Sequence, residues 1–215
     1  MEKQTIIVTG ATSEIGTEII RRFVKKGDNL VINALSKQKL EEVYQKFGAG
    51  ESVIMMAGDC GDRPTVIKLL AIATAQFGAV NVLINIAENF KTTLGLSEGD
   101  AYVERTLKTN LSRMVCTTLE IVQQMYIQQN GIVINIGPPY EQFMPGEDKA
   151  EKEGNSTIEL HKLSTRIVAH YGQFNIRFNT VELGTANHIG ELKEIAHMVY
   201  TIAKSKFISS DILIK

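Results

Sequence analysis

Short apolar runs alternate with segments of helical periodicity along the whole chain of 215 residues, and this alternation limits the possible folds. The runs are too short for helices and indicate buried strands. They are Ile6–Val8, Asn29–Ala34, Ser52–Ala57, Val80–Ile86, Gly131–Ile136, Ile176–Val181 and Asp211–Ile214. After a first helix that ends before Gly27, further helices are expected over Lys37–Phe47, Arg63–Phe77, Ala101–Gln129, Thr157–Tyr171 and Glu191–Lys204. Apolar strands separated by helices predict an α/β fold, a doubly wound parallel sheet of seven strands, in one domain over residues 1–215.

The turn after the first strand has the chemistry of an anion site. Thr9-Gly10 ends the strand, and Gly16 lies at the start of the helix that follows. Free N–H groups and the positive end of the helix dipole meet there, and glycine lets a phosphate come close. Glu14 lies in the same turn and is expected to point to solvent, because an inward carboxylate would repel a phosphate.

Composition excludes several classes of partner. The net charge is −1, and no block of like charges points to nucleic acid. No apolar run approaches the roughly 20 residues that span a bilayer, and the N-terminal residues lack a signal-peptide segment. Cys60 and Cys116 lack C-x-x-C spacing and indicate reduced thiols in a cytoplasmic protein. The four histidines are not at ligand spacing, so no metal is expected.

The stretch Thr9-Gly10-x-x-x-Glu14-Ile15-Gly16 resembles the T-G-x-x-x-G-x-G turn of the short-chain dehydrogenase/reductase family, with Glu14 in place of the middle glycine. Further positions that resemble family motifs follow in order along almost the whole chain: Asp59, Asn85-Ile86-Ala87-Glu88, Asn110, Asn179 and Gly184. The resemblance implies an NAD(P)-binding Rossmann domain whose partner is a dinucleotide.

The resemblance also implies a set of cofactor-binding residues. They are Gly10, Thr12, Ser13, Ile15, Gly16, Ser36, Lys37, Asp59, Cys60, Asn85 and Ala87. Ala34 and Leu35 stand where an acidic residue would bind the ribose of NAD, or an arginine the phosphate of NADP. Ser36 and Lys37 could contact a 2′-phosphate, which favours NADP over NAD; alternatively Lys37 is a solvated residue that begins the next helix.

The catalytic residues that the family uses are missing from the matching positions. In the family a serine orients the substrate carbonyl, a tyrosine transfers the proton, and a lysine four residues later lowers the tyrosine pKa. Here Pro138, Glu153 and Thr157 stand at those three positions. The other possible register, counted forward from Pro138, gives Glu151 and Asn155. The family's helix asparagine remains, as Asn110.

Tyr140, just beyond Pro138, is the alternative proton donor, with Lys149 or Lys152 as its partner; it can equally be a loop tyrosine beside a proline pair. Glu151 or Glu153 could donate a proton if burial raised its pKa.

The substrate side of the expected cleft departs further from the family pattern. Ile86, Glu88 and Leu183 replace an asparagine, a glycine and a proline. Only a few residues separate Gly184 from the last helix, where the family usually inserts a helical lid. A small-molecule substrate is therefore doubtful.

Three functions follow from these observations. The first is a dinucleotide-binding or assembly subunit with weak or no dehydrogenase activity. The second is an active NAD(P)H-dependent oxidoreductase of a carbonyl or alcohol, with Tyr140 as a relocated acid. The third is a structural or interaction protein that no longer binds nucleotides. The resemblance also implies a homodimer or homotetramer formed through the helices Ala101–Gln129 and Thr157–Tyr171. Apolar residues available there are Met114, Leu119, Val122, Leu160, Leu163, Ile167 and Val168.

Overall fold

One parallel sheet of seven strands runs through the chain. A computed structural model describes residues 3–47, 50–87, 100–137, 166, 169–183, 189–206 and 212–214; the side chains of 100–108, Glu182, Ile189 and 212–214 are not described. The strands are β1 (Thr5–Thr9), β2 (Asn29–Ala34), β3 (Val53–Ala57), β4 (Val82–Ile86), β5 (Gly131–Gly137), β6 (Ile176–Leu183) and β7 (Ile212–Ile214). Their order in the sheet is β3-β2-β1-β4-β5-β6-β7, and every neighbouring pair is parallel. The predicted doubly wound parallel sheet is confirmed.

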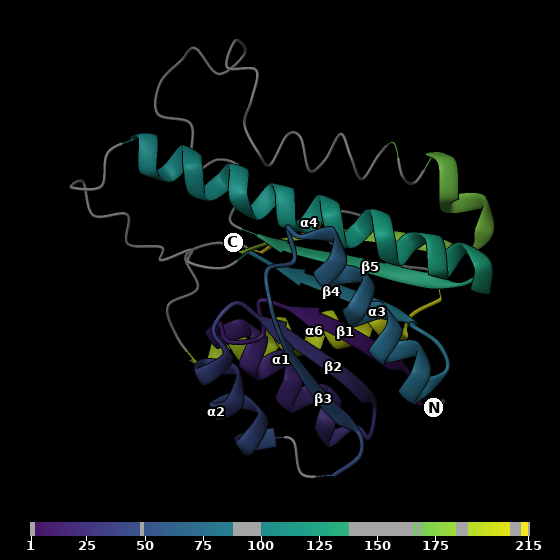
Figure 1. Ribbon diagram of the computed structural model, residues 1–215, viewed down its shortest axis with the longest axis horizontal. Coiled ribbons are helices and arrows are strands. Elements are labelled where there is room, and N and C mark those ends of the chain that lie inside the picture. The colour runs from purple at the N-terminus through teal and green to yellow at the C-terminus, as the bar shows by residue number, and fades with distance from the viewer. Residues whose placement is uncertain are drawn as a thin grey trace.

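Helices cover both faces of this sheet (Figure 1). The helices are α1 (Glu14–Lys25), α2 (Lys37–Phe47), α3 (Arg63–Phe77), α4 (Asp100–Gln128) and α6 (Ile189–Lys204), with a short 3₁₀ turn over Gly172–Phe174. Successive strand residues point to opposite faces. Ile6 and Val8 therefore pack with α1, α2 and α6, whereas Ile7, between them, packs with α3 and α4. Burial on both faces explains why the strands are almost wholly apolar.

Most predicted boundaries agree with the structure to within one or two residues. The first helix ends as expected: Lys26 is its last partly helical residue, and Gly27 follows with a φ of 80°. The strand predicted from Val80 begins instead at Val82. Val80 is fully buried, but the Gln128 side chain of α4 bonds both its N–H (3.1 Å) and its C=O (2.9 Å). Val80 is apolar and buried like a strand residue but is not part of the strand, so the sequence predicted the strand to begin too early.

The predicted helix Thr157–Tyr171 lies mostly outside the described residues. Arg166 and His170, which are described, are helical. Within the described part of the chain, no helix is long and apolar enough to cross a membrane.

Residues on α4 that were expected to supply an oligomer interface divide between two faces. Val122 is 1% exposed and packs on the sheet, and Met114 is 5% exposed. Leu119 is 45% exposed, and two residues about two turns further along α4 are also exposed: Tyr126 (41%) and Ile127 (74%). The outer face of α4 therefore retains apolar surface.

The order of the strands fixes where a ligand can bind. The chain first winds outward from β1 to β2 and β3, and then returns to β4 on the other side of β1. The connections leaving β1 and β4 therefore run in opposite directions and leave a crevice at the carboxyl ends of these strands. The turn after Thr9 and the end of β4 at Ile86 lie there.

Candidate nucleotide-binding site

The turn between β1 and α1 is built around Gly10. Its φ is 67°, in the left-handed region that suits glycine. A Cβ at this position would lie 2.5 Å from the backbone oxygen of Ile86, so the close approach of the turn to β4 also requires glycine. Ser13 caps α1: its hydroxyl donates to the Gly10 C=O (2.8 Å) and accepts from the Gly16 N–H (3.1 Å). A Cβ on Gly16 would lie 2.6 Å from the same carbonyl oxygen.

Three backbone donors of this turn remain available. The N–H groups of Ala11 and Ser13 bond Asn33 O (3.0 Å) and Gly10 O (3.2 Å). Those of Thr12, Glu14 and Ile15 have no protein acceptor in the part of the chain that is described. Together with the helix dipole, such donors form a site for a phosphate oxygen. This arrangement fits a dinucleotide pyrophosphate.

The charge of Glu14 does not oppose this use of the turn. Its side chain is exposed, as expected from the sequence. A carboxylate in the first turn of a helix also stabilises the helix through the dipole.

A buried polar network fixes β4 beside this turn. Asn85 is fully buried, and its carbonyl oxygen accepts from the hydroxyls of Thr9 (3.2 Å) and Thr117 (3.0 Å). Its amide nitrogen donates to Thr118 (3.1 Å) and to the side-chain oxygen of Asn135 (3.0 Å). One side chain thus joins β1, β4, β5 and α4. Because it does not reach the surface, any part that Asn85 has in nucleotide binding is to hold other groups in position.

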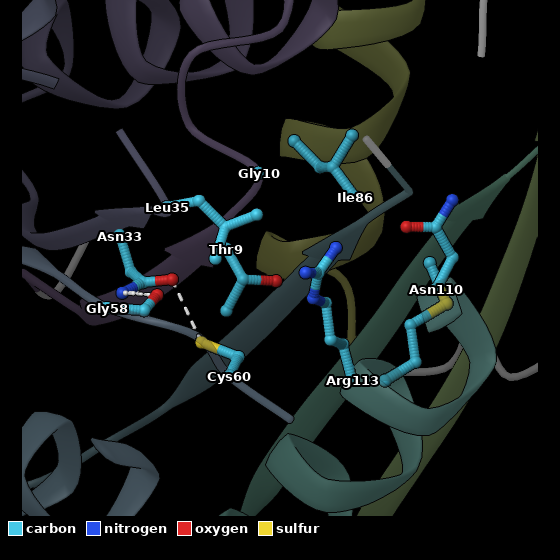
Figure 2. Close-up of a pocket in the computed structure, with 10 residues that line it drawn as sticks. Thr9, Gly10, Asn33, Leu35, Gly58, Cys60, Ile86, Asn110 and Arg113 are labelled. Atoms are coloured by element: carbon cyan, nitrogen blue, oxygen red, sulfur yellow. Dashed lines mark hydrogen bonds between the residues drawn. The ribbon is translucent and has the colours of Figure 1, made fainter. Parts of the chain in front are cut away.

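A pocket opens at the carboxyl ends of the strands, and the empty space in and around it, which includes open solvent, is about 320 Å³. Figure 2 shows the side chains that surround it. They come from the ends of β1, β2, β3 and β4 and from α4: Thr9, Gly10, Asn33, Leu35, Gly58, Cys60, Ile86, Asn110, Arg113 and Met114. The pocket therefore adjoins the glycine turn and extends toward β2 and β3.

The wall formed by β2 and β3 is held by Asn33. Its amide nitrogen donates to the C=O groups of Met56 (2.8 Å) and Gly58 (3.3 Å), and its oxygen accepts from the Cys60 thiol (2.9 Å). Asn33 is 2% exposed and Cys60 4% exposed. The Cys60 thiol therefore helps to hold this wall of the pocket through its hydrogen bond to the buried Asn33 side chain.

Asp59 is paired with Arg113 of α4. Its Oδ1 accepts from Arg113 Nε (2.8 Å) and its Oδ2 from Arg113 Nη2 (3.1 Å), and the Gly61 N–H donates to Oδ1 (2.8 Å). The Asp59 side chain is 47% exposed and that of Arg113 21% exposed. The Arg113 guanidinium, with a smaller contribution from the Gly61 N–H, holds the pKa of the Asp59 carboxyl below its ordinary value, although partial burial acts in the opposite direction.

The pair makes stability depend on pH in a defined direction. The pKa of Asp59 is lower in the folded chain than in the unfolded chain. Its contribution to the free energy of unfolding is therefore fully present above the unfolded-state pKa, and it is lost as the pH falls through the folded-state pKa. Asp59→Asn should lower the free energy of unfolding at pH 7 by up to about 1 kcal/mol, since half-exposed ion pairs contribute little. Urea unfolding should show this difference shrinking toward about pH 3. An equal difference at both pH values would contradict the assignment.

Several residues predicted to bind the cofactor do not line the pocket. Ser36 accepts from the Lys39 N–H (3.3 Å) at the start of α2, and Lys37 forms an exposed ion pair with Glu41 (3.7 Å). These contacts agree with the alternative in which Lys37 is a solvated helix residue. Ala87 donates its N–H to Ile136 O (3.0 Å), between β4 and β5.

Of the predicted catalytic residues, only Asn110 is described. It is 6% exposed and lines the pocket. The other positions discussed for proton transfer lie outside the described residues, as do Glu88 and Gly184: Pro138, Tyr140, Lys149, Glu151, Lys152, Glu153, Asn155 and Thr157.

The structure adds Arg113, Asn33 and Met114 to the residues around the pocket. Arg113 follows Asn110 by three residues on α4, so both lie on one helical face. That spacing is the only sequence feature that points to it. In the described ranges no group of three or more His, Cys, Asp or Glu side chains could hold a metal ion.

Comparison with known proteins agrees with this geometry. The family model "short chain dehydrogenase" matches residues 4–187. The 2-(R)-hydroxypropyl-CoM dehydrogenase of Xanthobacter autotrophicus is 25% identical over 181 residues, which are 81% of this chain and 71% of that protein. The NADP-dependent 3-hydroxy acid dehydrogenase YdfG of Shigella flexneri is 27% identical over 136 residues, which are 61% of this chain and only 53% of that protein.

A solved oxidoreductase of the short-chain dehydrogenase/reductase family from Burkholderia thailandensis superposes with a TM-score of 0.79. The superposition covers 99% of this chain and 91% of that one, at 17% sequence identity, and shows a common fold. The match of the family model extends from β1 through β6 and includes the glycine turn. This chain belongs to the short-chain dehydrogenase family.

Proposed function

We propose that this chain binds a nicotinamide dinucleotide but has weak or no dehydrogenase activity, and acts as a nucleotide-binding or assembly subunit. One contrast carries the proposal. The phosphate turn keeps the N–H donors of Thr12, Glu14 and Ile15. In contrast, Pro138 matches the family's serine, and Glu153, or Glu151 in the other register, matches its proton-donating tyrosine.

The described residues fit the phosphate part of such a cofactor. Gly10 and Gly16 allow the turn to pack closely against β4 and the start of α1, where a Cβ would collide with backbone. The N–H groups of Thr12, Glu14 and Ile15 lie in this turn. A bound NAD(P)H supplies a hydride from its nicotinamide ring. Transfer to a carbonyl also requires a proton, and a positioned donor contributes about 10²–10⁴-fold to the rate. Without that donor, turnover falls even when the nucleotide is bound.

The shortened substrate side supports the same proposal. Residues 184–188 alone separate β6 from α6, which leaves no length for a helical lid. Such a lid would exclude water from the reacting groups. The proposed protein therefore lacks a helical lid between β6 and α6.

NADP(H) is the preferred form in this proposal. Leu35 lines the pocket after β2, so no carboxylate stands there to repel a 2′-phosphate, and Ser36 follows directly. The name of the Shigella flexneri relative, which specifies NADP, supports this preference. Lys37 could add charge only by leaving Glu41.

A second candidate, an active carbonyl or alcohol oxidoreductase, is favoured by the dehydrogenase names of the relatives. In this version Tyr140 supplies the proton. The third candidate, an interaction protein that does not bind nucleotides, is favoured by Glu88, an acidic residue at the sequence position where the family has a glycine. The second candidate predicts that the protein oxidises NADPH in the presence of a carbonyl compound. The third predicts that it does not bind NADPH.

The turnover assay separates the first two candidates. Purified protein with NADPH and a panel of aldehydes and ketones should oxidise no NADPH above the rate without protein, and Tyr140→Phe should behave in the same way. Absorbance at the wavelength of the reduced nicotinamide follows the reaction. Oxidation that requires the protein and is abolished in Tyr140→Phe would establish the second candidate instead.

We also propose that the protein forms a homodimer or homotetramer in the cytoplasm. The exposed Leu119, Tyr126 and Ile127 on α4 support an interface along that helix. Two cysteines without a disulfide between them, Cys60 buried and Cys116 partly buried, suit a reducing compartment.

A further inference from the structure

The pocket near β3 is where the base of a bound dinucleotide would lie. In a doubly wound sheet the pyrophosphate binds at the β1–α1 turn, and the residue after β2 approaches the ribose. The next strand outward is β3, and Gly58 and Cys60 at its end line the pocket. The base subsite therefore lies between this segment and α4.

Arg113 enters this subsite from α4. Its side chain lines the pocket, and Figure 2 shows its guanidinium pointing into the pocket toward Thr9 and Ile86. Two of its nitrogens are held by Asp59, at 2.8 and 3.1 Å. Both carboxylate oxygens thus already accept hydrogen bonds from the protein, and the guanidinium points into the pocket in which the base is expected.

We propose that Arg113 is a specificity-determining residue that obstructs the base subsite, so that an adenine dinucleotide binds only when the Asp59–Arg113 pair opens. The inference rests on the proposed function, because it concerns the same cleft. The pair can open: both side chains are partly exposed, and such pairs are weak in water. The free energy needed to open the pair lowers the affinity for any ligand that carries the base.

Removing the arginine side chain should therefore tighten binding. In Arg113→Ala the obstruction is gone, and Asp59 becomes free to accept a hydrogen bond from the exocyclic amine of adenine. Both changes favour the ligand. Dissociation constants for ADP-ribose and NADPH should fall roughly three- to tenfold, the range expected when the opening of one bidentate ion pair is no longer required.

The chain contains a matched control in Arg63→Ala. Arg63, at the start of α3, pairs with Glu120 of α4 (Nε to Oε1 2.5 Å, Nη2 to Oε2 3.4 Å). This second bidentate pair also joins the segment after β3 to α4, but neither of its residues lines the pocket. Arg63→Ala removes the same type of contact and should leave both dissociation constants within about twofold of wild type.

Calorimetric titration of the three proteins with ADP-ribose and with NADPH tests the inference, after thermal unfolding has shown that each is folded. Tighter binding in Arg113→Ala alone supports it. Unchanged or weaker binding in Arg113→Ala, or equal tightening in Arg63→Ala, overturns it while the proposed function stands. If neither wild type nor Arg113→Ala binds either ligand, the proposed function fails and the inference fails with it.

Discussion

Gly10→Ala should lower the free energy of unfolding by about 2–5 kcal/mol and weaken NADPH binding at least about tenfold. The new Cβ would face two costs. A φ of 67° is unfavourable for alanine, and the Cβ would lie 2.5 Å from Ile86 O and 2.9 Å from Ile86 Cβ. Relief requires the turn to move away from β4, which displaces the donors at Thr12 and Ile15. Urea unfolding and calorimetric titration measure the two effects.

Gly27→Ala is the control for backbone strain alone. Gly27 has a similar φ of 80°, but a Cβ there would meet nothing within 4 Å. Only the cost of the left-handed conformation applies, about 1–2 kcal/mol, and NADPH binding should not change. If the two variants lose equal stability and bind NADPH equally well, the close approach of the turn to β4 does not constrain the site.

Asn85→Ala should cost about 3–5 kcal/mol of stability, because it removes the centre of a fully buried network. The hydroxyls of Thr9, Thr117 and Thr118 and the Asn135 amide would each lose a partner at 3.0–3.2 Å. A cavity would also remain between β4 and α4, since the surrounding strands are tightly packed. Urea unfolding at neutral pH measures the loss.

Asn130→Ala makes the same substitution at an exposed position. Its side-chain oxygen accepts one hydrogen bond, from Asn175 (3.2 Å). Loss of an exposed hydrogen bond costs no more than about 0.5–1 kcal/mol, because water replaces the partner. If Asn85→Ala were as mild as Asn130→Ala, the network would contribute little to holding β1 and β4 together.

The sheet could be predicted because its physical causes are local. Each strand is buried on both faces, so each is a short apolar run, and the helices between them supply the crossovers that parallel strands need. The Gly10 turn was equally readable, because a strand, glycines and a helix start adjoin in sequence. Val80 shows the limit: burial can be inferred from residue type, but its bonds to Gln128 come from a side chain 48 residues away.

The pocket was less predictable because its contacts join distant residues. The position of Asn85 in a family motif suggested a cofactor contact, but its four partners lie on β1, β5 and α4 and enclose it. Asp59 was expected to bind the cofactor, yet its carboxylate pairs with Arg113, 54 residues later. Pairings of this kind depend on how α4 lies across the sheet, which no local pattern encodes.

Calorimetric titration of wild-type protein with NADPH, in the presence of an excess of a carbonyl compound, tests the central claim most directly. The instrument records the heat of binding and the heat of any continuing reaction in one experiment. We expect saturable binding near the micromolar range, followed by a return to baseline. No heat at millimolar NADPH would contradict nucleotide binding, and a sustained heat flow that requires both protein and carbonyl would contradict the loss of dehydrogenase activity.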